Sequence, residues 1–232
     1  MNLEVAIKEK KKIRLHAYSV STKIEQRTQQ IIQMMLLHYQ CGELLSPLYT
    51  CIKELLVNAV KANFKNIFFE NHTPKNDPDQ VIEYDKALQL FRLEMSHKDA
   101  QNFERIARQK DIRAEVIFYM DDQDMTVEIH NPVPMTDMEL QTVQKKLHDA
   151  RQCEDITDYF LMNEDDPNKE GAGLGLVLVS IIIKSLGVPE SNFSIERLNS
   201  STLASLSVPL NEQTLECFRK NTSDSETSLA GM

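Results

Sequence analysis

Residues 170–187, "EGAGLGLVLVSIIIKSLG", place three glycines immediately before a strongly apolar segment of helical length. Glycine has no Cβ atom, so its backbone can approach a ligand closely, and the first turn of a helix offers unpaired N–H donors to an anion. The spacing of Gly171, Gly173 and Gly175 matches neither the dinucleotide fingerprint GxGxxG nor the P-loop. Two interpretations stay open from this stretch alone: a phosphate-binding loop, or a flexible hinge before a buried helix.

A second segment, "CIKELLVNAVKAN" (51–63), favours the phosphate-binding interpretation. Glu54, Asn58 and Lys61 follow one another at i, i+4 and i+7, which places them on one narrow stripe of an otherwise apolar helix. Buried carboxylate and amide groups need polar partners, so we expect this polar stripe to face a cleft with polar contents. The alternative is an ordinary helix with a few solvent-facing polar residues.

The chemistry of the polar stripe suits a nucleotide. A carboxylate such as Glu54 can orient or deprotonate a water or hydroxyl. The amide oxygen of Asn58 is a suitable ligand for Mg²⁺, which is usually held by phosphates and one or two protein oxygens. Lys61 supplies a compact positive charge for a phosphate.

Together, "ELLVNAVKAN" (54–63) and "GAGLGL" (171–176) resemble the N-box and the second glycine box of the GHKL superfamily of ATP-binding domains. The resemblance implies that Asn58 is the Mg²⁺ ligand, that Glu54 is the general base and that Lys61 contacts phosphate. It also implies an ATP lid at 150–170, with Tyr159 or Phe160 as its aromatic residue. The nucleotide contacts that it implies at the second glycine box are Gly171, Gly173, Leu174, Gly175 and Leu176.

The first glycine box of that superfamily is altered here. Its usual DxGxG pattern is replaced by "NPVPM" (131–135), directly after the predicted strand "TVEIH" (126–130). By the resemblance, Asn131 would accept the adenine amino group through its amide oxygen, as an asparagine side chain is able to do. Both glycines of the pattern are missing, and an Asn-Pro turn at the end of a strand is the alternative interpretation.

The order of elements predicts an α+β fold, namely a two-layer α/β sandwich with a mixed, mostly antiparallel sheet and helices on one face. We expect a single GHKL-like ATP-binding domain at 1–220, with a helical insertion at about 71–112 and a disordered tail at 221–232. One amphipathic face of the insertion is expected to pack on its own domain, with a partner or self-association surface as the alternative; it comprises Val81, Tyr84, Leu88, Phe91 and Met95. Strands are predicted at 12–20, 66–70, 113–120, 125–131, 192–198 and 202–210, and helices at 21–40, 47–63, 80–95, 98–110, 136–151 and after the glycines.

Composition excludes several classes of function. The net charge of −9 argues against nucleic-acid binding, which needs a clustered basic surface. The longest uncharged apolar stretch, Leu174 to Ile183, is far shorter than the ~20 residues of a membrane helix, and the N-terminal residues do not resemble a signal peptide. Four cysteines without CxxC spacing indicate reduced thiols. We therefore expect a cytoplasmic protein with no nucleic-acid or membrane partner.

The resemblance leaves the activity open. None of the six histidines has the H-[DE]-x-x-x-P setting of a phosphoacceptor, so a kinase of this type would phosphorylate a serine or histidine of another protein. The sequence predicts a Mg·ATP-binding regulator that acts on a separate protein partner, as a kinase or through ATP-gated contacts with slow hydrolysis. A homodimer is compatible with it. The alternative is a catalytically inactive interaction module that keeps the fold.

Overall fold

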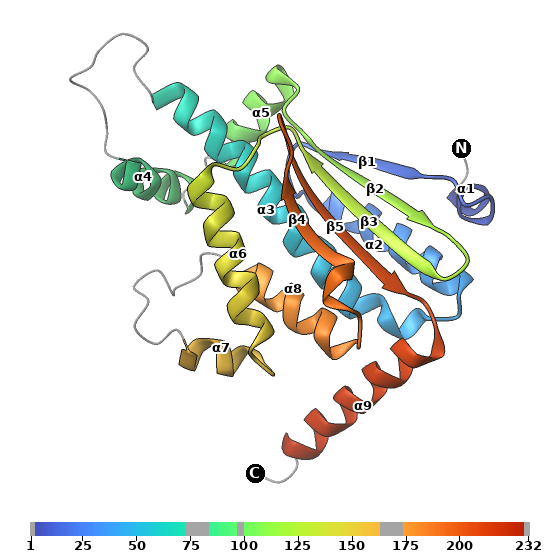
Figure 1. The fold of residues 1–232 in the computed structure, drawn as a ribbon. Coiled ribbons are helices and arrows are strands. Elements are labelled where there is room, and N and C mark those ends of the chain that lie inside the picture. The colour runs from blue at the N-terminus through green and yellow to red at the C-terminus, as the bar shows by residue number, and fades with distance from the viewer. Residues whose placement is uncertain (1–2, 73–83, 97–99, 163–173, 230–232) are drawn as a thin grey trace.

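A computed structural model describes residues 3–72, 84–96, 100–162 and 174–229. At its centre lies a five-stranded sheet of order β1-β2-β3-β5-β4 (Figure 1). The predicted α+β sandwich is confirmed. Every pairing between these described strands is antiparallel, whereas a mixed, mostly antiparallel sheet was expected. The strands are β1 (Ile13–Ala17), β2 (Ala114–Met120), β3 (Asp124–Asn131), β4 (Phe193–Arg197) and β5 (Thr202–Pro209).

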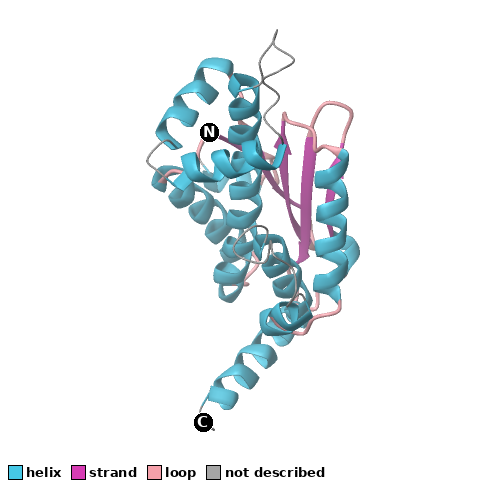
Figure 2. Ribbon diagram, turned by 90° about the vertical axis from the view of Figure 1, so that its left-hand side faces the viewer, coloured by secondary structure: helices cyan, strands magenta, loops and turns pink. Residues whose placement is uncertain are grey.

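Alternation along the strands separates the two faces of the sheet. Val116 and Phe118 of β2 are fully buried, whereas Glu115 and Tyr119, which flank this pair, are half-buried, and Ile117 between them is buried as well. Successive side chains of a strand point to opposite faces, so one face carries the core and the other is largely polar. Figure 2 shows the helices gathered mostly on one side of the sheet.

The helical layer is built around α3 (Leu45–His72), which contacts β2 and β3 as well as its neighbouring helices. Leu48, Ile52 and Leu56 of α3 are fully buried in the same apolar core as the sheet. None of the described helices combines the length and apolar composition that a membrane crossing requires. The other helices are α1 (Leu3–Lys8), α2 (Thr22–His38), α4 (Tyr84–Ser96), α5 (Ala100–Lys110), α6 (Asp137–Arg151), α7 (Ile156–Met162), α8 (Leu174–Ser185) and α9 (Glu212–Leu229), with 3-10 turns η1 (Gly42–Leu44) and η3 (Glu190–Asn192).

The prediction of a strand at 66–70 is wrong, because α3 continues through these residues to His72. Phe64, Ile67 and Phe68 are buried at helical spacing, and residues 48–72 contain neither glycine nor proline. The preference of isoleucine and phenylalanine for β-strands is small, and the burial of these side chains in the helical layer overrides it. The result is one uninterrupted helix of 28 residues.

The insertion packs on its own domain, as predicted, through an aromatic cluster with α3. Phe103 of α5 stacks on Phe64 with ring centroids 5.5 Å apart, and Phe91 of α4 lies 5.6 Å from Phe68 and 6.0 Å from Phe103. Phe91 and Phe103 are both buried. Val81 and the side chain of Tyr84, which the sequence also assigned to this apolar face, lie outside the described residues.

The two ends of the chain differ from the prediction. Helix α1 precedes the first strand and is absent from the predicted elements. Helix α9 continues to Leu229, whereas disorder was predicted from residue 221. The segment 212–229 contains no glycine or proline to end a helix, and Leu215 anchors its first turns in the core.

Candidate functional site

The polar stripe of α3 becomes more exposed along the helix. Glu54 and Asn58 are half-buried, whereas Lys61 is exposed. The side-chain nitrogen Nδ2 of Asn58 is buried and has no hydrogen-bond partner. The stripe thus combines an exposed ammonium group with an amide whose buried nitrogen has no hydrogen-bond partner in the described part of the chain.

Gly175, in the first turn of α8, lies directly against Glu54. A Cβ atom built at residue 175 would be 3.2 Å from Cδ of Glu54 and closer still to its Oε2 atom. This contact joins the two sequence motifs that are 121 positions apart in the chain. The space beside the α-carbon of Gly175 holds the Glu54 carboxylate.

The other residues of the second glycine box are placed unequally. Leu176 is 7% exposed and belongs to the main core, which leaves only its backbone for contact with a ligand. Leu174 is half-buried and packs on a smaller apolar cluster. Gly171 and Gly173 lie outside the described residues.

Asn131, at the end of β3, points from the sheet toward α3. Its Nδ2 atom donates a 3.3 Å hydrogen bond to the carbonyl oxygen of Ala59, the residue that follows Asn58. The residue is only 4% exposed, and its Oδ1 atom is buried without a partner. The amide is therefore oriented by its nitrogen, and its buried acceptor oxygen makes no hydrogen bond to the described part of the chain.

Unpartnered buried polar atoms are concentrated at this helix–sheet contact. Within the described part of the chain four side chains carry such an atom, and Asn58, Asn63 and Asn131 are three of them, with Thr28 of α2 the fourth. Buried polar groups in proteins nearly always have partners. Three orphaned amides on α3 and the end of β3 are the pattern expected of a polar ligand site.

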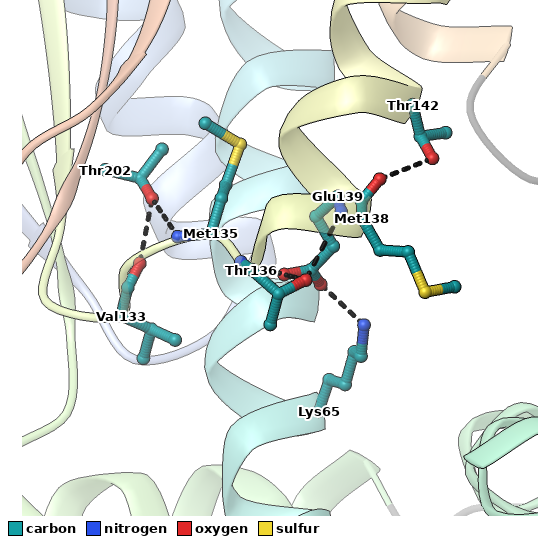
Figure 3. A network of polar contacts seen from close by, with 8 residues as sticks. All are labelled: Lys65, Val133, Met135, Thr136, Met138, Glu139, Thr142 and Thr202. Atoms are coloured by element: carbon teal, nitrogen blue, oxygen red, sulfur yellow. Dashed lines mark hydrogen bonds and ion pairs between the residues drawn. The ribbon is translucent and has the colours of Figure 1, made fainter.

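Sequence reasoning did not identify the residues that hold the turn after Asn131. Thr202 of β5, the pairing partner of Asn131, donates its hydroxyl hydrogen to the Val133 carbonyl over 2.9 Å and accepts from the Met135 N–H over 3.1 Å (Figure 3). A side chain on the neighbouring strand thus fixes the "NPVPM" turn in place of glycines. Only knowledge of the strand pairing could have revealed this contact.

The next residues connect the same turn to α3. Thr136 caps α6 in a capping box with Glu139, and Lys65 forms a 2.5 Å ion pair with Glu139 (Figure 3). Burial raises the pKa of Glu139, but hydrogen bonds from Lys65 and Thr136 outweigh it, so the net pKa lies below its ordinary value. The T-x-x-E spacing of the capping box was a signal available in the sequence.

The aromatic residues predicted for the lid lie on α7. Tyr159 is buried with Cys153 and Val177, whereas Phe160 is half-buried. Lys184 of α8 holds the start of this region by donating to the Cys153 carbonyl over 3.1 Å and pairing with Glu154 at 2.8 Å. Residues 163–170 of the predicted lid lie outside the described residues.

Acidic and thiol groups do not form an independent metal centre among the described residues, where no cluster of three or more His, Cys, Asp or Glu side chains could hold an ion. Cys51, on the helix turn before Glu54, is fully buried, and burial raises its pKa to about 12.

A hollow lined by Arg151, Lys184 and Glu190 lies between α6, α8 and η3, and none of the predicted site residues lines it.

Comparisons with known proteins add a distant relative. The chain is 30% identical over 162 residues to an uncharacterized protein of Treponema pallidum (strain Nichols). The match covers 69% of this chain and 30% of the relative, so the chain spans less than a third of that protein's length. No family model matches the chain. No solved structure matches it either.

Proposed function

We propose that this chain is a GHKL-type domain that binds Mg·ATP between α3, the end of β3 and the start of α8, and that it regulates a separate protein in the cytoplasm. The observation that carries the proposal is the amide of Asn131. Its nitrogen is engaged by the Ala59 carbonyl, and its buried oxygen has no partner. An acceptor held in this way fits the amino group of adenine.

The remaining residues support the same ligand. Asn58, one residue before Ala59, carries an amide whose buried nitrogen is unpartnered, and its oxygen would be the protein ligand of Mg²⁺. The exposed ammonium of Lys61 would contact phosphate. Glu54 would act as the base toward the attacking group. Bound Mg·ATP would supply the transferable phosphoryl group, and the partner protein or water would accept it.

Calorimetric titration with ATP, in the presence and absence of Mg²⁺, tests this proposal. We expect saturable, Mg²⁺-dependent binding that is weakened at least about tenfold in Asn58→Ala and in Asn131→Ala, because each variant removes a charge-assisted or buried polar contact. Asn66→Ala is the matched control, since Asn66 lies on the same helix and bonds Glu70 instead. Absence of binding at millimolar ATP would overturn the proposal.

A protein-interaction module without nucleotide is the second candidate. It is favoured by the apolar surface of α4, where Leu90 and Leu93 are 44% and 55% exposed. Incubation with γ-labelled ATP separates the activities. Transfer of the label to another protein indicates a kinase, and slow release of labelled phosphate indicates an ATPase. If neither occurs and ATP does not bind, the chain is an interaction module.

A further inference from the structure

We propose that Gly175 is a positioning residue for Glu54. The missing side chain at residue 175 leaves the space that the Glu54 carboxylate occupies, and this allows the carboxylate to lie against α8. The contact itself is independent of nucleotide. Its consequence for catalysis rests on the proposed function above.

The atoms nearest to the open space beside Gly175 all belong to Glu54. The three heavy atoms nearest to a Cβ built at residue 175 are Oε2, Cδ and Cβ of Glu54, the last at 3.5 Å. A methyl group at residue 175 therefore meets a flexible side chain, with no backbone atom of α3 among these nearest atoms. Rotation of Glu54 away from α8 relieves the overlap without moving either helix.

Gly42 shows that this relationship is not a general property of glycines in this chain. A Cβ atom at residue 42 would meet only Leu37 Cδ2, at 3.8 Å, which is an ordinary contact distance. Gly42 at the start of η1 therefore tolerates alanine, and Gly42→Ala provides a matched control for the same chemical change.

The first experiment uses the protein without nucleotide. We expect Gly175→Ala to keep or raise the melting temperature, by up to a few degrees, since alanine is the better helix former. Its crystal structure should show the Glu54 carboxylate rotated away from residue 175, with α3 and α8 at their original spacing. A structure in which Glu54 stays in place and α8 moves outward would overturn the inference.

The second experiment compares Gly175→Ala, Glu54→Ala and the double variant, with Gly42→Ala as control. If Gly175 acts through Glu54, Gly175→Ala reduces phosphate release or transfer about 100-fold, as Glu54→Ala does, and the double variant loses no more. The Kd of the double variant for Mg·ATP should lie within about twofold of the Kd of Glu54→Ala alone.

The opposite result identifies a phosphate-binding glycine. In that case Gly175→Ala weakens Mg·ATP binding at least about tenfold whether residue 54 is Glu or Ala, and the positioning role is excluded. If the wild-type chain binds Mg·ATP without turnover, the Kd comparison and the crystal structure decide. If it does not bind Mg·ATP, the proposed function fails, while the crystal structure of Gly175→Ala still decides the contact.

Discussion

The side-chain nitrogen of Asn131 and the backbone carbonyl of Ala59 share a 3.3 Å hydrogen bond, which joins the end of β3 to the middle of α3. The bond uses the donor half of the amide and leaves the acceptor half, Oδ1, buried and unpartnered. A side chain with only one free function can discriminate between bases that differ in one group.

The first prediction is selectivity for a 6-amino purine. ITP carries a carbonyl oxygen where ATP carries its amino group, so two acceptors would face each other at Asn131. We expect ITP to bind at least about tenfold more weakly than ATP. Competition calorimetry with the two nucleotides measures the ratio, and equal affinities would assign base recognition to other residues.

The second prediction concerns Thr202, which fixes the turn after Asn131. Thr202→Val keeps the shape of the side chain but removes one donor and one acceptor, which we expect to destabilise the fold by about 1–3 kcal/mol. ATP affinity should also fall, because the turn no longer holds Asn131. Thr202→Ser retains the hydroxyl and serves as the control in thermal unfolding and calorimetry; a defect of the same size in Thr202→Ser would assign the effect to packing instead.

The third prediction is a pH dependence at the Lys65–Glu139 ion pair. The pKa of Glu139 in the folded chain lies below its ordinary value of 4.5, so its ionised form stabilises the fold above that value. This contribution is lost as the pH falls through the lowered pKa. We expect Glu139→Gln to melt at a lower temperature than the wild type at pH 7, and the difference to vanish below the lowered pKa.

Melting curves between pH 7 and pH 3 provide the measurement. A gap between Glu139→Gln and the wild type that stays constant over this range would contradict the prediction. Lys53–Glu25, an ion pair between α3 and α2 whose lysine is more exposed than Lys65, is the comparison: Glu25→Gln should change the melting temperature less, since solvent weakens an ion pair.

The fourth prediction tests the insertion as part of the core. Phe91→Ala removes a buried ring from the cluster with Phe68 and Phe103, and we expect a loss of about 3–5 kcal/mol in the free energy of unfolding. Denaturant unfolding measures it. Leu90→Ala, at an exposed position on the same helix, should cost much less; similar losses in the two variants would contradict the cluster's role.

The sequence predicted most of the fold because the strong periodic patterns were correct. Alternation identified the strand at 12–20, two hairpin patterns identified the other four strands, and the apolar stripes identified the main helices. The segment 66–70 was misassigned because its β-preference was visible, whereas the partner helices that hold it in α3 lie 20 to 40 positions further along the chain. Local preference loses to packing that only the folded chain supplies.

The sequence alone identified the residues of the candidate site, but it did not identify which residues they contact. The spacing of Glu54 and Asn58 on one helix follows from the helical period alone. That Gly175 accommodates a carboxylate, and that Thr202 replaces the missing glycines after Asn131, depends on contacts between distant parts of the chain. Such contacts leave no periodic signal in a single sequence.

Helix α3 carries Asn58 and the aromatic contacts of Phe64 and Phe68 on one continuous backbone. At 1.5 Å per residue, the Asn58 amide and the Phe68 ring are separated by about 15 Å of helix. This segment contains no glycine or proline, the residues at which helices usually kink. We therefore expect any displacement of Asn58 to be passed along this helix to the two rings. A probe attached to α4 or α5 would register occupancy of the site mechanically, although neither helix contributes a residue to it.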